Sequence, residues 1–370
     1  MSFFVGLSHP WVRCGHDFGP RPPPWQGVGP TDWGAVEAEL RRWREAAGVR
    51  WSRWWLLAGG VNYPVGRDPH ACFERRGGRL VGRPPALPEG FLGDFERLLV
   101  AAARAGVRLV PSLLSFEFFQ PLVAHGDVFR GGRAPIVFGP RTEPLEASID
   151  AFLDATLRPL LDVSTRHRAS VAAWEVVNEP DWVVEGGPLH LRVVGGRLRR
   201  TPKTVPARAM CALLERAVDR IVRRGFVASV GFKEADPPWL LPRLRRKLRR
   251  YGDAGQYLHQ LHHYPSLYEP APLPHHDRLP FRPCLVGEMP TARGRCLDPF
   301  VMRWRDDWDW RRAHDPARYL ERRIDIVRRK GYPGALLWSG RAADRASAWG
   351  PLQWAQVRRA LGRPPGVRTL

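Results

Sequence analysis

Residues 173–180 read Ala-Trp-Glu-Val-Val-Asn-Glu-Pro, an apolar run that ends in an amide, a carboxylate and a proline. Such a run is typical of a strand buried on both faces, as in a parallel sheet, and Pro180 ends the strand directly after the polar pair. Asn178 and Glu179 are therefore expected at a carboxyl-terminal strand edge, where barrels of parallel strands build their active sites. An Asn-Glu-Pro tripeptide alone is also a common way to enter a turn.

A second carboxylate has a matching context. Residues 283–290 read Pro-Cys-Leu-Val-Gly-Glu-Met-Pro, again a short apolar strand that ends in a glutamate, and Glu288 follows Glu179 by 109 residues. This spacing equals about three strand-and-helix units, and strands three units apart face each other across the mouth of a barrel. Two carboxylates placed there can approach one substrate atom from different sides. A retaining glycosidase needs this arrangement, with an acid/base and a nucleophile about 5 Å apart.

Strands and helices alternate along the whole chain, which is typical of an α/β fold with a parallel sheet. We predict one (β/α)8 TIM barrel over residues 1–370, with loop insertions at about 59–90 and 183–206. A short hairpin is expected in the first insertion, and Gly195-Gly196 predicts a second hairpin over 189–199. The eight strands are expected at 3–7, 49–57, 107–114, 171–177, 227–232, 257–262, 284–286 and 334–338. The expected helices include 31–47, 91–105, 144–161, 207–223 and 348–361, the first capped by Thr31 or Asp32.

The chain has a formal net charge of +21, and nearly all of the excess is arginine. Pairs of arginines are scattered over the predicted helices, which is typical of a solvated surface, so no specific nucleic acid partner is expected. The densest run, residues 243–250, could still bind a polyanion without sequence specificity.

The five cysteines are odd in number and contain no Cys-x-x-Cys spacing, so neither a zinc site nor a disulfide framework is indicated. They are Cys14, Cys72, Cys211, Cys284 and Cys296. The amino terminus has no signal-peptide pattern and no apolar run approaches 18 residues, so we expect a cytoplasmic protein without a membrane partner. The sequence leaves the oligomeric state open.

The expected strand exits carry a recurring set of polar and aromatic residues. The set resembles the clan A glycoside hydrolases, and most closely the cellulase-like proteins around glycoside hydrolase family 5, over nearly the whole chain from Gly6 to about Gly340. The resemblance implies a retaining glycoside hydrolase that cleaves O-glycosidic bonds of an oligo- or polysaccharide without metal or other cofactor, and these bonds are expected to be β-linked. The matching residues are Arg53, Asn178, Glu179, His262, Tyr264, Glu288 and Trp338.

The resemblance assigns the nucleophile and its support. Glu288 looks like the nucleophile, and Arg53, five residues after Gly48, matches the family's strand-two arginine that supports it. Arg50 is a rival for this role. Tyr264, in a His-x-Tyr motif, is implied to hold its hydroxyl near the nucleophile.

The same resemblance assigns the groups around the leaving oxygen. Glu179 looks like the acid/base, and burial together with the neighbouring carboxylate is expected to favour its protonated form. Asn178 looks like the residue that bonds the sugar 2-hydroxyl, His262 fits the first position of the His-x-Tyr motif, and Trp338 resembles the aromatic floor beside the scissile bond.

Two segments depart from the family's pattern. Residues 8–11 read Ser-His-Pro-Trp where related proteins often have Asn-Tyr-Pro-Trp, and residues 57–60 read Leu-Ala-Gly-Gly where a polar contact is usual. The alternative function is therefore a carbohydrate-binding barrel with impaired catalysis. A basic nucleic-acid-associated protein is a third hypothesis, disfavoured by the pair of glutamates, and Glu175 is a minor alternative for a catalytic carboxylate.

Overall fold

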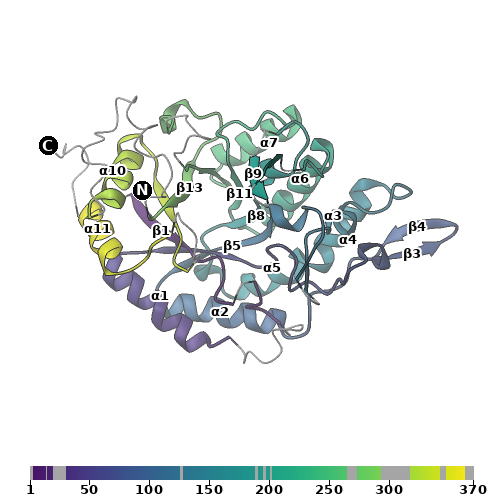
Figure 1. The fold of residues 1–370 in the computed structure, drawn as a ribbon, viewed down its shortest axis with the longest axis horizontal. Helices are drawn as coiled ribbons and strands as arrows, with labels where there is room; N and C mark the ends of the chain where they lie inside the picture. Colours follow the sequence, from purple (N-terminus) through teal and green to yellow (C-terminus); the bar gives the residue numbers. More distant parts are fainter. Residues whose placement is uncertain are drawn as a thin grey trace.

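Eight parallel strands close into a barrel in the order β1-β14-β13-β12-β11-β8-β5-β2 (Figure 1). The computed structural model describes residues 3–13, 15–19, 31–125, 128–187, 191–194, 197–200, 202–264, 273–292, 317–341 and 347–362. The predicted (β/α)8 fold is confirmed. The barrel strands are β1 (Phe4–Ser8), β2 (Trp51–Trp55), β5 (Arg108–Ser115), β8 (Trp174–Asn178), β11 (Ala228–Phe232), β12 (Tyr257–His262), β13 (Cys284–Pro290) and β14 (Gly334–Trp338).

The helices pack around the outside of the barrel (Figure 1). Asp32 caps α1, because its side chain accepts the backbone N–H of Ala35 at 2.9 Å. The described helices are α1 (Trp33–Ala47), α2 (Phe91–Ala105), α3 (Ala134–Phe138), α4 (Leu145–Ala155), α5 (Leu157–Arg166), α6 (Ala207–Arg223), α7 (Pro242–Asp253), α10 (Tyr319–Arg329) and α11 (Pro351–Leu361). None of the described helices is both long enough and apolar enough to cross a membrane.

The single helix predicted over 144–161 is wrong in one respect, because the chain forms two helices there, α4 and α5. They meet at Thr156, whose φ of −120° and ψ of −65° are not helical. Pro159 explains the break, since it has no N–H to donate to the carbonyl of Ala155 and its ring would clash with that carbonyl. The Thr156 hydroxyl instead donates to the Phe152 carbonyl at 2.7 Å.

Both predicted hairpins are present. The first pairs β3 (Phe73–Arg76) with β4 (Arg79–Gly82) and extends away from the barrel (Figure 1). The second pairs β9 (Leu191–Val194) with β10 (Arg197–Arg200), while the turn at 195–196 lies outside the described residues. A third hairpin, β6 (Val123–His125) with β7 (Val128–Arg130), was not predicted. Short 3-10 helices complete the connections: η2 (Pro69–Cys72), η3 (Phe116–Phe118), η4 (Arg168–Ser170), η5 (Pro180–Trp182) and η6 (His276–Arg278).

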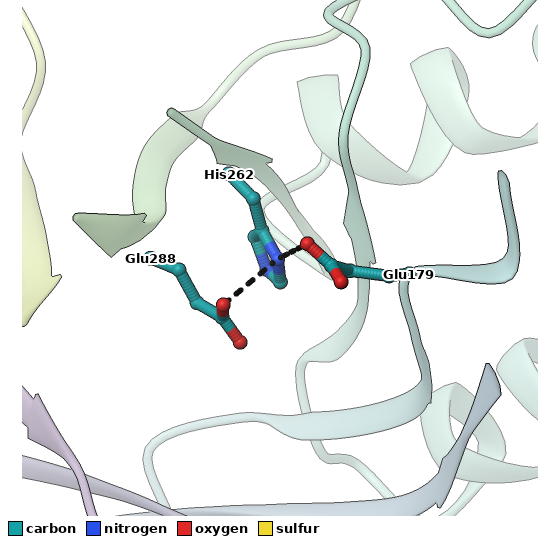
Figure 2. A group of neighbouring side chains, drawn as sticks. All are labelled: Glu179, His262 and Glu288. Atoms are coloured by element: carbon teal, nitrogen blue, oxygen red, sulfur yellow. Dashed lines mark hydrogen bonds and ion pairs between the residues drawn. The ribbon is translucent and has the colours of Figure 1, made fainter. Parts of the chain in front are cut away.

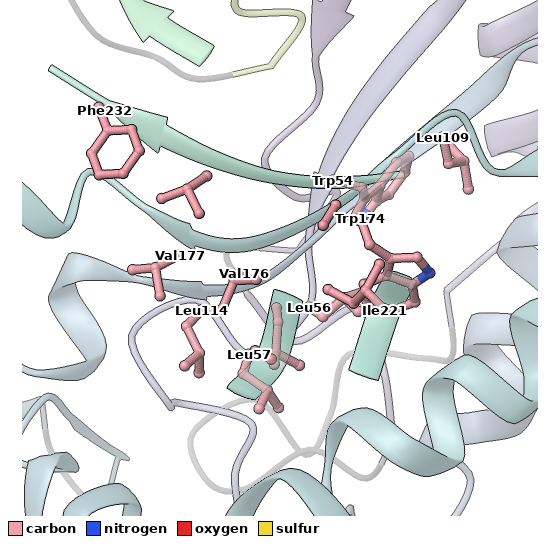
Figure 3. Close-up of a cluster of buried hydrophobic side chains, with 14 of the residues drawn as sticks. Trp54, Leu56, Leu57, Leu109, Leu114, Trp174, Val176, Val177, Ile221 and Phe232 are labelled. Atoms are coloured by element: carbon pink, nitrogen blue, oxygen red, sulfur yellow. The ribbon is translucent and has the colours of Figure 1, made fainter. Parts of the chain in front are cut away.

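Two apolar clusters fill the protein. The larger one lies between the barrel strands and the helices and includes Trp54, Trp174 and Ile221 (Figure 3). The smaller one contains Phe4 and Leu336 and is formed by barrel residues that mostly lie toward the amino ends of their strands. The polar side chains described below lie toward the carboxyl ends of the strands.

The described cysteines are not joined by disulfide bonds. Cys72, Cys211 and Cys284 are free thiols. Cys14 and Cys296 lie outside the described residues.

The contact between α2 and β8 predicts a large stability effect. Phe95 is fully buried, with its ring centroid 5.8 Å from that of Trp174. Phe95→Ala should lower the free energy of unfolding by about 3–5 kcal/mol, because it leaves a cavity in a close-packed core. Leu352→Ala, at a side chain 46% exposed on α11, should change it by about 0.5 kcal/mol or less. Urea denaturation measures both, and equal effects of the two variants would contradict this description of the core.

Candidate active site

Arg53 lies on β2 inside the barrel and is fully buried. Its Nε and Nη2 donate to the two oxygens of Glu175, each at 2.6 Å, and Nη2 also donates to Asn178 Oδ1 at 2.6 Å. Nη1 donates to Glu288 Oε1. Burial lowers the pKa of Arg53, but the two carboxylates outweigh burial and raise it. One guanidinium therefore connects three strands at the base of the site.

Glu175 serves the structure of this site. It is fully buried on β8, and it also accepts hydrogen bonds from Ser112 Oγ at 2.9 Å and Gln260 Nε2 at 2.7 Å. Burial raises the pKa of Glu175, but Arg53 outweighs burial and lowers it. Glu175 does not line the cavity described below. The rival arginine, Arg50, is exposed and precedes β2, so the structure places Arg53, not Arg50, beside Glu288.

Glu288 lies on β13 with 4% of its surface exposed. Arg53 holds its Oε1, and the Tyr264 hydroxyl donates to its Oε2 at 2.7 Å. Both oxygens of Glu288 are therefore fixed by donors, as the resemblance implied for a nucleophile with an arginine and a tyrosine beside it.

Glu179 leaves β8 in a conformation that is unusual for a residue with a side chain. Its φ of 49° and ψ of 52° are left-handed, which costs about 1–2 kcal/mol and is found at functional sites. Trp182 Nε1 donates to Glu179 Oε2 at 2.8 Å, and Oε1 lies 3.0 Å from Nδ1 of His262. The turn therefore directs the Glu179 carboxylate toward β12.

A cation that the sequence did not reveal lies close to Glu179. Burial raises the pKa of Glu179, but the Lys233 ammonium and the hydrogen bonds from His262 and Trp182 outweigh burial and lower it. The expectation that Glu179 is protonated when substrate binds stays a prediction.

His262 stands between the two glutamates (Figure 2). Its Nδ1 lies 3.0 Å from Glu179 Oε1 and 3.5 Å from Glu288 Oε2. One ligand atom from each of the three residues lies within 4.8 Å of the others, so an oxygen of Glu179 comes within 4.8 Å of an oxygen of Glu288. The three side chains could hold a metal ion in this arrangement, and the absence of a metal or other cofactor stays a prediction.

The carboxylates open into a cavity of about 480 Å³, within the range of small-molecule sites. Trp338 meets Trp55 edge-on at a ring distance of 5.5 Å, and Trp182 stacks on Phe116 at 5.6 Å. Flat apolar rings thus lie on the cavity wall beside charged groups. The aromatic residues that line it are Trp11, Trp55, Phe116, Trp182, Tyr264 and Trp338.

The segments that depart from the family's pattern form part of this site. His9 is buried and stacks on Trp54 at a ring distance of 4.1 Å, so it packs in the core. Trp11, Ala58 and Gly59 line the cavity. These two segments therefore present mainly apolar surface to the cavity.

Three charged residues of the cavity wall were not predicted: Lys233, Glu117 and Arg130, the last of which lies on β7. Lys233 directly follows β11, and Glu117 lies in η3 after β5, where it accepts a hydrogen bond from Ser115. Burial raises the pKa of Glu117, with Glu179 adding to this effect. None of the three belongs to a recognisable motif, and the only available signal for Lys233 and Glu117 was their position just beyond a predicted strand.

Close backbone approach makes room for the polar side chains. A Cβ on Gly231 would lie 2.7 Å from His262 Nε2, and one on Gly287 would lie 2.5 Å from Gln260 Oε1. The strand register also shifts next to these residues, between Ser229 and Gly231 and between Leu261 and His262. Such irregularities are frequent beside active sites because they redirect side chains.

The most basic run of the sequence lies in α7, and three of the six basic residues in this run form ion pairs with acidic side chains. Arg243 and Lys247 contact Glu215 at 3.0 and 2.6 Å, and Lys247 also contacts Asp219 at 2.8 Å. Arg245 pairs with Asp236. This pairing agrees with a solvated surface, and the absence of a specific nucleic acid partner stays a prediction.

Comparisons with known proteins identify the fold. Neither a protein-family model nor a curated protein matches the chain. The structure is similar to the β-mannanase of the blue mussel Mytilus edulis (16% identity, TM-score 0.61, covering 98% of this chain and 92% of that one). It is also similar to the endo-1,4-β-mannanase of Eisenia fetida (15% identity, TM-score 0.64, covering 98% of this chain and 91% of that one). A third similar structure is that of the GH5_18 protein of Streptomyces cattleya in complex with Manb1-4GlcNAc (15% identity, TM-score 0.58, covering 98% of this chain and 82% of that one). The chain therefore has the (β/α)8 fold found in glycoside hydrolase family 5.

The buried pair of Arg53 and Glu175 predicts a strong effect on stability. Arg53→Met should lower the free energy of unfolding by about 3–5 kcal/mol, because it leaves Glu175 buried without its cation. Adding Glu175→Leu to Arg53→Met should recover part of the loss, since it removes one of the two buried carboxylates, Glu175 and Glu288, that then lack the cation.

Arg243→Met is the control, because Arg243 is 80% exposed and its ion pair with Glu215 is screened by water. Its effect should be about 1 kcal/mol or less by the same denaturant titration. An Arg53→Met variant as stable as this control would contradict the description of a buried ion pair.

Proposed function

We propose that this chain is a retaining glycoside hydrolase that cleaves β-glycosidic bonds of an oligo- or polysaccharide. The observation that carries the proposal is the approach of Glu179 and Glu288 oxygens within 4.8 Å in an aromatic-walled cavity. Retaining enzymes hold their carboxyl groups about 5–5.5 Å apart, whereas inverting enzymes need about 6.5–9.5 Å to accommodate a water. The short separation favours a double displacement.

In the first step of the proposed reaction, Glu288 attacks the anomeric carbon while protonated Glu179 gives its proton to the leaving oxygen. Arg53 and Tyr264 position the attacking carboxylate by their hydrogen bonds to Glu288. In the second step, Glu179 takes a proton from water, and the resulting hydroxide displaces Glu288 and restores the original configuration. Asn178, fixed by Arg53, is proposed to donate to the sugar 2-hydroxyl, where hydrogen bonds strengthen in the transition state.

β-Mannosides are the substrates to test first. The similar structures from Mytilus edulis and Eisenia fetida are named as β-mannanases, and the Streptomyces cattleya structure holds Manb1-4GlcNAc. This similarity supports the choice of sugar, while the loops around the cavity determine which sugar and which bond are accepted.

A carbohydrate-binding barrel with impaired catalysis is the second candidate. It is favoured by the two segments that depart from the family's pattern, because their residues Trp11, Ala58 and Gly59 line the cavity. Turnover assays separate the two candidates.

The test is a panel of aryl β-glycosides, with the mannoside, glucoside, galactoside and xyloside, assayed from about pH 3 to about pH 8 because the rate of a two-carboxylate reaction depends on pH. Wild type should cleave at least one of them. Glu288→Gln should abolish turnover, because the nucleophile is lost. Glu179→Gln should lower kcat/KM by about 10²–10⁴-fold on substrates with poor leaving groups.

Glu45→Gln, at an exposed position on α1, provides the control and should match wild type. If wild type were no more active than the two active-site variants on every substrate, the hydrolase would be excluded. Saturable sugar binding without turnover would then support the binding barrel.

A further inference from the structure

Arg130 lines the cavity from the β6–β7 hairpin, at some distance along the chain from every barrel strand. Its side chain passes over Gly59: a Cβ on Gly59 would lie 3.5 Å from Arg130 Cβ and 3.8 Å from Arg130 Cδ. The backbone N–H of Gly131 donates to the Gly59 carbonyl at 2.8 Å and fixes the hairpin against this segment. The absence of a side chain at Gly59 therefore leaves room for Arg130 on the cavity wall.

A second arginine fixes the end of this hairpin. Arg133 is buried, and its guanidinium donates to the carbonyls of Val65, Gly66 and Phe129 at 2.5, 2.9 and 3.1 Å. Its backbone N–H donates to the Phe118 carbonyl at 3.1 Å. These bonds join the hairpin to the loop after β2 and to η3, so the fold itself holds Arg130 in place.

Glu117 lies beside Arg130 on the same wall. A Cβ on Gly59 would lie 3.3 Å from Glu117 Cβ, so Glu117 and Arg130 flank the same glycine. The charges of Glu179 and Arg130 both act on the Glu117 carboxyl group. Among the described residues, no acidic side chain forms an ion pair with Arg130, Glu117 included. Two opposite charges thus face one cavity without closing on each other.

The charges of the wall decide which kind of ligand group fits between Glu117 and Arg130. An anionic group would be attracted by Arg130 but repelled by Glu117, and the carboxylates of Glu179 and Glu288 line the same cavity. A cationic group would be repelled by Arg130 and Lys233. A guanidinium only donates hydrogen bonds, whereas carboxyl oxygens accept them. Neutral hydroxyl groups, which both donate and accept, satisfy the two side chains together.

Aromatic rings adjoin this pair of charges. Phe116 precedes Glu117 in η3, and Trp182 stacks on Phe116 at a ring distance of 5.6 Å. Both rings line the cavity. Apolar walls with a few placed polar groups are typical of small-molecule sites. A sugar ring fits such a wall, because it has apolar faces and a polar edge.

We propose that Glu117 and Arg130 form a subsite for a second, neutral sugar unit of the substrate, next to the unit held at Glu179 and Glu288. This inference rests on the proposed function for the choice of an oligosaccharide as ligand. Arg130 donates to hydroxyl groups of this unit, Glu117 accepts from them, and the rings of Phe116 and Trp182 pack against it. The subsite therefore selects neutral oligosaccharides over chains that carry a carboxylate on each unit.

Matched trisaccharides test the subsite by isothermal titration calorimetry in the Glu288→Gln background, which stops turnover. The probes are β-1,4-mannotriose, cellotriose and the β-1,4-linked trisaccharide of mannuronate, which differs from mannotriose by the carboxylate at C6. A neutral trisaccharide should bind more tightly than the mannuronate. Arg130→Met should weaken its binding about 10-fold, because hydrogen bonds to a charged group are lost. Glu117→Gln should narrow the preference, because it removes a carboxylate that repels the mannuronate.

The controls make the same chemical changes at exposed residues that do not line the cavity. They are Arg79→Met on β4 and Glu45→Gln on α1, and both should bind the trisaccharides as the parent does. Unchanged binding in Arg130→Met, or no binding of either neutral trisaccharide, would overturn the subsite. Tighter binding of the mannuronate that Arg130→Met abolishes would also overturn it, by showing a site for an anionic sugar.

The outcome for the subsite is separate from the outcome for the hydrolase. Arg130-dependent binding of a neutral trisaccharide, without turnover of any aryl glycoside by wild type, would support the subsite and exclude the hydrolase. Turnover by wild type, with trisaccharide binding unchanged in Arg130→Met, would overturn the subsite and leave the hydrolase supported.

Discussion

The guanidinium of Arg53 is the interaction on which the site depends. Three of its nitrogens donate to Glu175, Asn178 and Glu288, which come from β8 and β13. A buried cation requires buried anions, and both carboxylates rely on this one cation, so removal of Arg53 would leave Glu175 and Glu288 without it. Arg53 thereby holds one oxygen of Glu288, the proposed nucleophile, and the Tyr264 hydroxyl holds the other.

A different set of contacts governs Glu179. Its backbone is left-handed, its carboxylate accepts from Trp182 and His262, and Lys233 supplies the charge. The two glutamates are therefore held by separate cations, Arg53 for Glu288 and Lys233 for Glu179. His262 contacts both glutamates and therefore links the two sets of contacts.

Much of this arrangement could be predicted from the sequence. The apolar runs that end in Asn178-Glu179 and in Glu288 placed both glutamates at strand exits, because parallel strands of a barrel deliver such residues to one edge. Arg53, His262, Tyr264 and Trp338 followed from the resemblance, and the structure brings Arg53, His262 and Tyr264 into contact with the glutamates and places Trp338 on the cavity wall.

Other features depend on interactions that a linear pattern does not encode. Lys233 and Glu117 reach the cavity from the bend after β11 and from η3, whose conformations depend on tertiary contacts, so their place beside Glu179 could not be predicted from the sequence. The break between α4 and α5 had a visible signal in Pro159, but the apolar periodicity continues across it. The shifts of strand register beside Gly231 and His262 leave no mark in the sequence, because they follow from the packing of neighbouring strands.

The central claim is that Glu288 forms a covalent bond to the sugar while Arg53 positions it. A 2,4-dinitrophenyl 2-deoxy-2-fluoro-β-mannoside, or the analogue of whichever sugar the protein accepts, slows the second step and traps this intermediate. Mass spectrometry of the digested protein should find one fluorosugar, attached to Glu288, and none in Glu288→Gln. A label on Glu179 or Glu175, or turnover with inverted configuration and no label, would contradict the account.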